Sequence, residues 1–215
     1  WKGHLVVDDY GGYKKLFNGD VVEVGCWAHA RRKFFDLHAA SQSPMAAEAV
    51  LRIGLLYEIE ARGRDMSVPE RKALRQSESV PVLQSLHAWL QEQTRILAPN
   101  SSSAKAVAYT LKRWPALRVY ADSGNLPIDN NPVENSIRPI ALGKKNWLFA
   151  GSERAGRRAA AIQSLLGTAK LNGLEPVAWL TGVLEKLPTW KNNRLEELLP
   201  LRKEVPVQKE ESKAR

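Results

Sequence analysis

Two short apolar runs near the start of the chain predict strands. Residues 4–7 form the first run, which ends at Asp8 and a glycine turn and so places a carboxylate at the end of a strand. Residues 21–27 form a nearly continuous second run, typical of a buried parallel or central strand. Residues 28–38 then predict a helix, so the first part of the chain is expected to combine strands with a helix.

The pattern becomes helical from residue 44 to residue 115, where Ala, Leu, Glu, Gln and Arg alternate with Pro and Ser clusters. Leu51, Leu55 and Ile59 recur at four-residue spacing and predict the buried side of one helix. Two further helices are indicated by the apolar positions Leu83, Leu86, Trp89 and Leu90, and Val107, Leu111 and Trp114. We expect a helical insertion with its own small core, into which both tryptophans pack.

The last third is predicted to be extended at first and helical afterwards. Residues 117–120 indicate a short strand or extended segment, and a turn-rich stretch leads from them to a helix that begins near Asn131. A loop is expected at 151–158, and the charged tail 201–215 is predicted to be disordered. Two helices are predicted between this loop and the tail. The apolar side of the first comprises Ala159, Ile162, Leu165, Leu166 and Ala169, and that of the second comprises Trp179, Leu180, Val183, Leu184 and Leu187.

Composition narrows the class of partner. The 215 residues include 32 Lys or Arg against 23 Asp or Glu, a net charge of +9, and the pI is near 9.7. This favours nucleic acid or another anionic partner, although a merely basic protein has the same balance. The single cysteine, Cys26, excludes an intramolecular disulfide and fits a reducing compartment. No apolar run reaches the length of a membrane span, so a cytoplasmic location is expected.

The stretch 129–149, DNNPVENSIRPIALGKKNWLF, is the most informative part of the chain. A plain structural interpretation covers its beginning, because Asn131 as N-cap, Pro132 and Glu134 have the spacing of a capping box. That interpretation does not explain the cations that follow. Residues 132–170 hold seven Lys or Arg against two Asp or Glu, a local net charge of +5.

The second interpretation of this stretch is a site that handles phosphodiesters. Glu134 would hold a divalent metal, and Arg138 follows one helical turn later on the same face. Donors for a phosphate backbone come next in Lys144, Lys145 and Asn146, followed by the flat surface of Trp147, which suits either a DNA base or core packing.

Cys26 and His29 have a spacing seen in some zinc sites, but zinc needs about four ligands and the chain has no second such pair. No zinc site is therefore expected. His29 is predicted either to tie the second strand to the following helix through a hydrogen bond or to contact DNA beside the active site.

Together, these motifs resemble transposases of the insertion-sequence-66 type, a branch of the acidic-triad (DDE) transposases. The resemblance lies in residues 7–13 (VDDYGGY), 25–34 (GCWAHARRKF), 129–149, 168–173 (TAKLNG) and 193–200 (NRLEELLP), and leaves the helical middle less diagnostic. It implies an α/β fold that is a partial ribonuclease H-like (retroviral integrase-like) domain, with a large all-helical insertion and C-terminal helices.

The resemblance also implies a division of the chain. We expect a ribonuclease H-like part at 1–38, the helical insertion at 39–117, the helix of the catalytic glutamate with the C-terminal helices at 118–200, and the tail at 201–215.

By the same resemblance, Asp8 matches the second catalytic aspartate and Glu134, 126 residues later, the catalytic glutamate. Asp9 stands where the family commonly has glycine, and the alignment through residues 10–13 favours Asp8. Asp8 and Glu134 are expected to hold Mg²⁺ or Mn²⁺. DNA contacts are expected at His29, Arg31, Arg32, Lys33, Arg138, Lys144, Lys145, Asn146, Trp147, Arg154 and Arg157.

The implied reaction explains these residue types. Strand cleavage and joining are in-line displacements at phosphorus, which two Mg²⁺ ions about 4 Å apart can assist. Mg²⁺ prefers oxygen ligands, so carboxylates from separate elements must converge. The implied partners are transposon ends and target DNA, bound by a homo-oligomer on paired ends and associated with the nucleoid.

The family's first catalytic aspartate lies upstream of the matched sequence. The chain is therefore expected to be the C-terminal part of a catalytic domain, inactive or nearly so alone, with a two-metal site only in the complete domain. Two alternatives stay open: a remnant that binds DNA without cutting it, and a metal-dependent nuclease or resolvase on the same fold.

Overall fold

The computed structural model describes residues 1–17, 19–147 and 149–201, without the side chain of Trp147. The predicted disordered tail lies outside the described residues from 202 onward. The chain divides into two compact units, Trp1–Glu134 and Asn135–Arg215.

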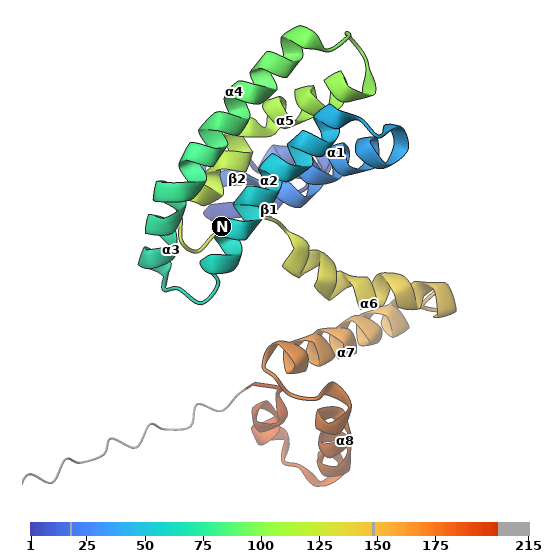
Figure 1. Cartoon of the computed structure of the whole chain (residues 1–215). Helices are drawn as coiled ribbons and strands as arrows, with labels where there is room; N and C mark the ends of the chain where they lie inside the picture. The colour runs from blue at the N-terminus through green and yellow to red at the C-terminus, as the bar shows by residue number, and fades with distance from the viewer. Residues whose placement is uncertain (18, 148, 202–215) are drawn as a thin grey trace, which may run out of the picture. The chain divides into compact units, whose positions relative to one another are not determined.

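A two-stranded parallel sheet opens the first unit. β1 (Gly3–Val7) pairs with β2 (Val21–Gly25) in a register that sets Val7 against Gly25, and Figure 1 shows the two strands beside the helices of this unit. A 3₁₀ helix, η1 (Gly11–Leu16), lies between them in sequence. Both predicted strands are confirmed, but the second ends at Gly25 rather than residue 27, because Cys26 caps the helix α1 (Trp27–Ser41).

The three helices expected in the middle region are confirmed as α2 (Pro44–Arg62), α4 (Val80–Ile96) and α5 (Ser102–Arg118). Two further elements, α3 (Val68–Leu74) and the π-helical η2 (Arg75–Ser79), were not predicted. α1 packs on α2, and α5 packs on α4, α1 and β2. The largest fully buried apolar side chains of this core include Val24, Trp27, Phe34, Ile53, Leu56, Leu86, Leu90, Val107, Leu117 and Tyr120.

One predicted face was wrong. On α2, Leu51 is 67% exposed and Leu55 is 45% exposed, while Ile53 and Leu56 are fully buried and Ile59 nearly so. A four-residue step exceeds one turn of 3.6 residues, so a row at that spacing drifts around the helix. The packing of Trp89 and Trp114 is confirmed, since both lie partly buried against the core.

The extended segment predicted at 117–120 was wrong too. α5 continues to Arg118, and a 3₁₀ helix, η3 (Val119–Asp122), follows it. Leu117 and Tyr120 are both buried. Their three-residue spacing suits a helix better than a strand, in which they would point to opposite faces.

A buried arginine holds the segment that leads to the last helix of this unit. Arg75 Nε and Nη2 donate to both carboxylate oxygens of Glu60, at 2.8 and 2.6 Å. Its Nη1 donates to the carbonyls of Tyr120 at 3.0 Å and Leu126 at 2.9 Å, and to that of Ser123. One side chain therefore connects α2, η2 and the segment before α6 (Asn131–Trp147).

Gly124 fits the same segment closely against α3. A Cβ atom at this position would overlap the carbonyl oxygen of Val68. Arg71 Nη1 donates to the Gly124 carbonyl at 3.0 Å. The approach to α6 is thus determined by backbone contacts that accept only glycine at this point.

The second unit is helical and open. α6 runs into it and is followed by α7 (Glu153–Leu171), α8 (Pro176–Lys186) and the 3₁₀ helices η4 (Leu187–Thr189) and η5 (Asn192–Leu198). Ser152 caps α7, so the loop expected at 151–158 is shorter than predicted. Among its described residues only Ala169 and Pro200 are buried, and the predicted burial of Ile162 (49% exposed) and Leu184 (58% exposed) was wrong.

Within residues 1–17, 19–147 and 149–201, no helix has both the length and the apolar character needed to span a membrane.

Candidate functional site

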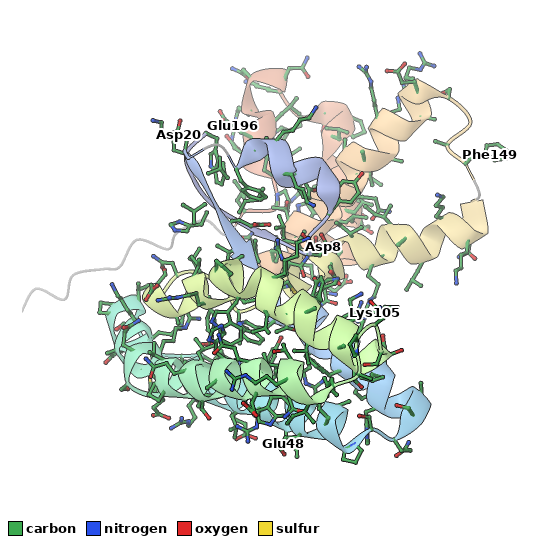
Figure 2. The ribbon with its side chains drawn as sticks, turned by 90° about the horizontal axis from the view of Figure 1, so that it is seen from above. Asp8, Asp20, Glu48, Lys105, Phe149 and Glu196 are labelled. Atoms are coloured by element: carbon green, nitrogen blue, oxygen red, sulfur yellow. The ribbon has the colours of Figure 1, made fainter. Side chains whose placement is uncertain are left out.

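Three side chains from distant parts of the first unit converge where β1 ends. Asp8 directly follows β1, His29 lies in the first turn of α1, and Glu134 lies in the first turn of α6; Asp8 is labelled in Figure 2. One ligand atom from each, a carboxylate oxygen or an imidazole nitrogen, lies within 4.8 Å of the other two. His29 Nε2 is 3.5 Å from Glu134 Oε1 and 4.0 Å from Asp8 Oδ2.

Asp8 and Asp9 have different partners. Asp8 Oδ1 accepts a hydrogen bond from the backbone N–H of Tyr10 at 3.1 Å, and its other oxygen faces His29. Asp9 Oδ1 lies 3.1 Å from Arg113 Nη1. Asp9 also has a φ of 77°, in the left-handed region that few residues other than glycine adopt. Asp8 is therefore the aspartate that joins the cluster.

Cys26 and Asn130 orient the histidine. The Cys26 thiol donates to Asn130 Oδ1 at 2.9 Å, and its sulfur lies 3.2 Å from His29 Nδ1. Burial raises the pKa of the Cys26 thiol, so it keeps its hydrogen at neutral pH. Because the thiol hydrogen is directed at Asn130, the sulfur can accept a hydrogen bond from the Nδ1–H of His29. In the tautomer with the hydrogen on Nδ1, it is Nε2 that can bind a ligand beside Glu134 and Asp8.

Further hydrogen bonds connect the residues before α6 with the start of α1 and with α2. The Trp27 N–H donates to the Ile128 carbonyl at 3.1 Å. Asp129 is buried and accepts hydrogen bonds from the Tyr57 hydroxyl and the Asn131 side-chain amide, each at 2.9 Å, and from the Asn131 N–H at 3.1 Å. Burial, with the charge of Asp129 next, raises the pKa of Tyr57, which therefore stays a donor.

The capping box expected at Asn131 was wrong by one position. The N–H groups of Val133 and Glu134 donate to the Asn130 carbonyl, at 3.0 and 3.1 Å, and Asn131 is already the first residue of α6. The Asn131 side chain donates to Asp129 instead. Capping therefore does not explain why an acid stands at position 134.

The donor set of the cluster fits a divalent cation. Asp8 and Glu134 have side chains 40% and 37% exposed, and neither has a lysine or arginine ion-pair partner among the described residues. Two carboxylates this close repel each other, and a bound cation would offset that repulsion. Carboxylate oxygens suit Mg²⁺, and an added imidazole nitrogen is accepted by Mn²⁺ and later transition metals.

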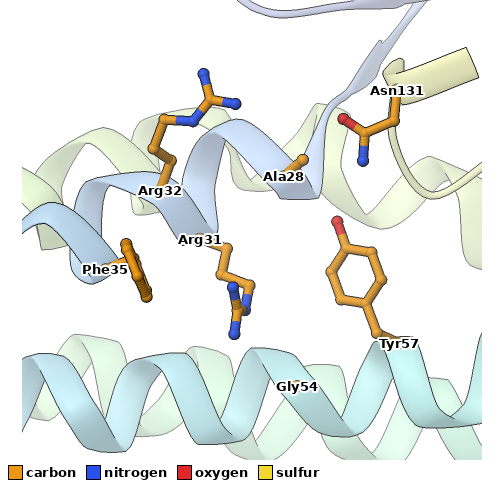
Figure 3. A pocket seen from close by; sticks show the side chains of 7 residues that line it. All are labelled: Ala28, Arg31, Arg32, Phe35, Gly54, Tyr57 and Asn131. Carbon is orange, nitrogen blue, oxygen red and sulfur yellow. The ribbon is translucent and has the colours of Figure 1, made fainter. Parts of the chain in front are cut away.

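A cavity of about 400 Å³ lies beside the cluster, between α1 and α2. Figure 3 shows Arg31 directed toward the space between the two helices, Arg32 directed away from it, and the Tyr57 hydroxyl toward Asn131. Its lining residues are Ala28, Arg31, Arg32, Phe35, Gly54, Tyr57 and Asn131.

The predicted DNA contacts on α1 have different surroundings. Arg31 is half-buried and Arg32 exposed, and both line the cavity. Lys33 Nζ instead lies 5.3 Å from the ring centroid of Tyr109. His29 belongs to the carboxylate cluster.

The other predicted DNA contacts belong to the second unit. All those with described side chains are exposed, and Arg157 forms an ion pair with Glu153 at 2.6 Å. The side chain of Trp147 lies outside the described residues. The set comprises Arg138, Lys144, Lys145 and Asn146 on α6, and Arg154 and Arg157 on α7.

Sequence reasoning missed the supporting residues of the cluster. Asp129 and Asn130 lie in the stretch 129–149 but were given no role there, and Tyr57 belonged to no motif. The one available signal was the spacing of Cys26 and His29, which places them one turn apart at a helix start.

Two family models together match most of the chain. A family model described as "Transposase IS66 family" matches residues 1–158, and one described as "IS66 C-terminal element" matches residues 164–201. No solved structure matches the chain.

Two curated relatives come from Sinorhizobium fredii (strain NBRC 101917 / NGR234) and are described as uncharacterized proteins. Protein y4hP is 38% identical over 215 residues, covering 92% of this chain and 39% of y4hP. Protein y4jD is 39% identical over 209 residues, covering 93% of this chain and 41% of y4jD. The chain thus spans about two fifths of the length of these relatives.

Proposed function

The chain belongs to the IS66 transposase family, and on that premise we propose that it supplies two carboxylates to a centre for DNA strand cleavage and strand transfer. The observation that carries the proposal is the convergence of Asp8 and Glu134, 126 residues apart, on His29, with no lysine or arginine paired to either acid among the described residues. The chain spans about two fifths of its longer relatives. The reaction of the whole protein, a ribonuclease H-like fold and a homo-oligomer on paired DNA ends are therefore parts of the proposal.

Asp8, Glu134 and His29 would hold the divalent ion, Mg²⁺ or Mn²⁺. When bound, such an ion polarises the phosphate and stabilises charge on the leaving oxygen. The carboxylates neutralise the ion's charge and leave space for substrate oxygens, since both are partly exposed. Cys26 and Asn130 keep the imidazole lone pair directed at the cluster.

The cations of α1 complete this centre. α1 begins beside the carboxylates, and Arg31 and Arg32 lie within one turn of His29. Phosphate contacts of this kind position the backbone without reading sequence. They would hold the DNA next to the acids, while the exposed cations of α6 and α7 bind DNA in the second unit.

Mn²⁺ binding, followed by electron paramagnetic resonance, tests the proposed centre in the chain as it stands. We expect Glu134→Gln to lose binding. Glu92→Gln is the matched control, because Glu92 is an exposed acid of α4 paired with Arg95. Equal affinity in wild type and Glu134→Gln would reject the centre.

Incubation with supercoiled DNA and Mn²⁺ distinguishes the classes of function. Metal-dependent nicking that disappears in Glu134→Gln supports catalysis, and joined products support strand transfer over a nuclease or resolvase. DNA binding without nicking, in a chain that binds Mn²⁺, favours the DNA-binding alternative.

A further inference from the structure

We propose that the cavity between α1 and α2 binds a single unpaired nucleotide of the DNA strand, beside the carboxylate cluster. The proposal rests on the proposed function, because it assigns the ligand to the same DNA substrate. The cavity adjoins the cluster through the chain itself: Ala28 precedes His29, and Asn131 precedes Glu134 by less than one turn. All the residues concerned belong to the first unit.

The size of the cavity selects one nucleotide over a duplex. Its volume of about 400 Å³ lies at the lower end of the range for small-molecule sites. A base pair within a duplex cannot enter a space between two packed helices. A nucleotide outside the base stack can, as occurs in enzymes that extrude a base from the duplex.

The charge of the cavity selects an anionic ligand. Neither Arg31 nor Arg32 has a hydrogen-bond or ion-pair partner within the part of the chain that the structure describes. Arg31 is half-buried and directed into the space between the helices, so its guanidinium is available to an anion that enters this space. A phosphate would satisfy it through a bidentate contact, and Arg32, at the rim, would reach a neighbouring phosphate.

The remaining lining residues suit a base. Phe35 is 52% exposed and offers a free aromatic surface on α1; stacking on such a surface tolerates any base. Asn131 and Tyr57 add polar groups at the other end of the cavity. Gly54 on α2 borders open space, because a Cβ there would meet no atom within 4 Å.

This geometry provides a substitution that fills the cavity without removing any polar group. Gly54→Leu places a side chain in the open space, whereas Gly54→Ala adds one methyl group and improves helix propensity. Gly167→Leu is a control of the same type on α7, where a Cβ also meets no atom within 4 Å. Circular dichroism and thermal melting of each variant check that the chain folds.

The probe is a DNA duplex with one bulged 2-aminopurine, compared with the fully paired duplex, in EDTA so that binding does not depend on the metal centre. We expect wild type to bind the bulged duplex about tenfold more tightly and to change the probe's fluorescence. Gly54→Leu, Arg31→Gln and Phe35→Leu should lose most of this preference, while Gly54→Ala, Gly167→Leu and Glu92→Gln should keep it.

Equal affinity of wild type for the two duplexes would overturn the proposal, as would an unchanged preference in folded Gly54→Leu. Failure here, with Mn²⁺ binding and nicking intact, would leave the proposed function standing. Loss of Mn²⁺ binding or nicking would not alter the EDTA result, so the two failures are distinguishable.

Discussion

Adjacent aspartates at the end of β1 enter two opposite electrostatic environments. Asp9 and Glu23 share Arg113, whose Nη1 lies 3.1 Å from one carboxylate and 2.7 Å from the other. Asp8 instead faces Glu134 and His29. The first pair of acids shares an arginine, whereas the second has no lysine or arginine partner among the described residues.

This difference separates a structural carboxylate from one available to a ligand. Arg113 is 8% exposed, and its two ion pairs connect α5 with β2 and with the residues that follow β1. The Asp8–Glu134 pair is reachable from solvent, and its mutual repulsion favours a bound cation. Acidity and strand position alone do not distinguish the two aspartates, but their partners do.

The largest expected effect tests that distinction directly. Asp8→Asn should weaken Mn²⁺ binding by more than about 100-fold, since losing even the outer partners of a metal ligand costs about 10- to 100-fold. Asp9→Asn, the matched change one residue away, should weaken it by less than about threefold because Asp9 faces Arg113. Isothermal titration gives both affinities. A larger loss in Asp9→Asn would reverse the assignment.

The next effect concerns stability. Arg113→Met leaves Asp9 and Glu23 close together without their cation, and we expect about 2–3 kcal/mol less free energy of unfolding. This is below the value for a fully buried pair because both acids are partly exposed. Urea unfolding at neutral pH measures it.

Two controls sharpen this experiment. Arg95→Met removes an exposed pair with Glu92 and should change the free energy by less than about 1 kcal/mol. Neutralising both acids in the Arg113→Met background, with Asp9→Asn and Glu23→Gln, should restore much of the loss. If it restores none, packing rather than unpaired charge explains the effect.

A smaller effect is expected at Cys26, which contacts His29 beside the Asp8–Glu134 pair. Cys26→Ala removes the sulfur beside His29 Nδ1, so we expect about a tenfold loss of Mn²⁺ affinity. Cys26→Ser keeps a donor and an acceptor at this position and should retain most of the affinity. Equal affinities in the two variants would show that the thiol does not orient the imidazole.

The positions of Asp8 and Glu134 could be predicted from the sequence better than the residues that contact the acids of this region. The strand end at Asp8 and the helix start near Glu134 are local patterns, so both could be predicted from apolar runs and turn residues. Arg113 could not be assigned to Asp9, because that ion pair depends on how α5 packs against β2. The role of Asn130 likewise depends on its contact with Cys26, 104 residues away in sequence.

The same limit explains the errors in the helices. Helical period predicted that α2 exists, but which side is buried depends on its packing against α1, so Leu51 was placed inward and Ile53 overlooked. Tyr120 was predicted to lie in a short strand or extended segment, but it is buried in a 3₁₀ helix that follows α5. Local patterns predict which helices and strands form, whereas long-range contacts determine which face of a helix is buried and which residues its side chains contact.

The smallest expected effect adds a third kind of carboxylate to the comparison. Glu70 is exposed and has no cationic partner within the described part of the chain, but it accepts hydrogen bonds from the Ser67 N–H at 2.9 Å and the Ser67 hydroxyl at 2.6 Å. These bonds lower the pKa of Glu70. Its contribution to stability is therefore present above the pKa of an unfolded glutamate, about 4.3, and is lost as the pH falls through the lower folded value.

Glu70→Gln should accordingly be less stable than wild type at pH 6, with a difference that shrinks as the pH approaches 3.5. Urea unfolding of both proteins across this range measures it, and Glu92→Gln serves as the control for an exposed acid held by an ion pair. A difference that grows on acidification would mean that Glu70 is destabilised by its charge. The carboxylate would then resemble the Asp8–Glu134 pair, and hydrogen bonding alone would not suffice to stabilise an acid without a cation.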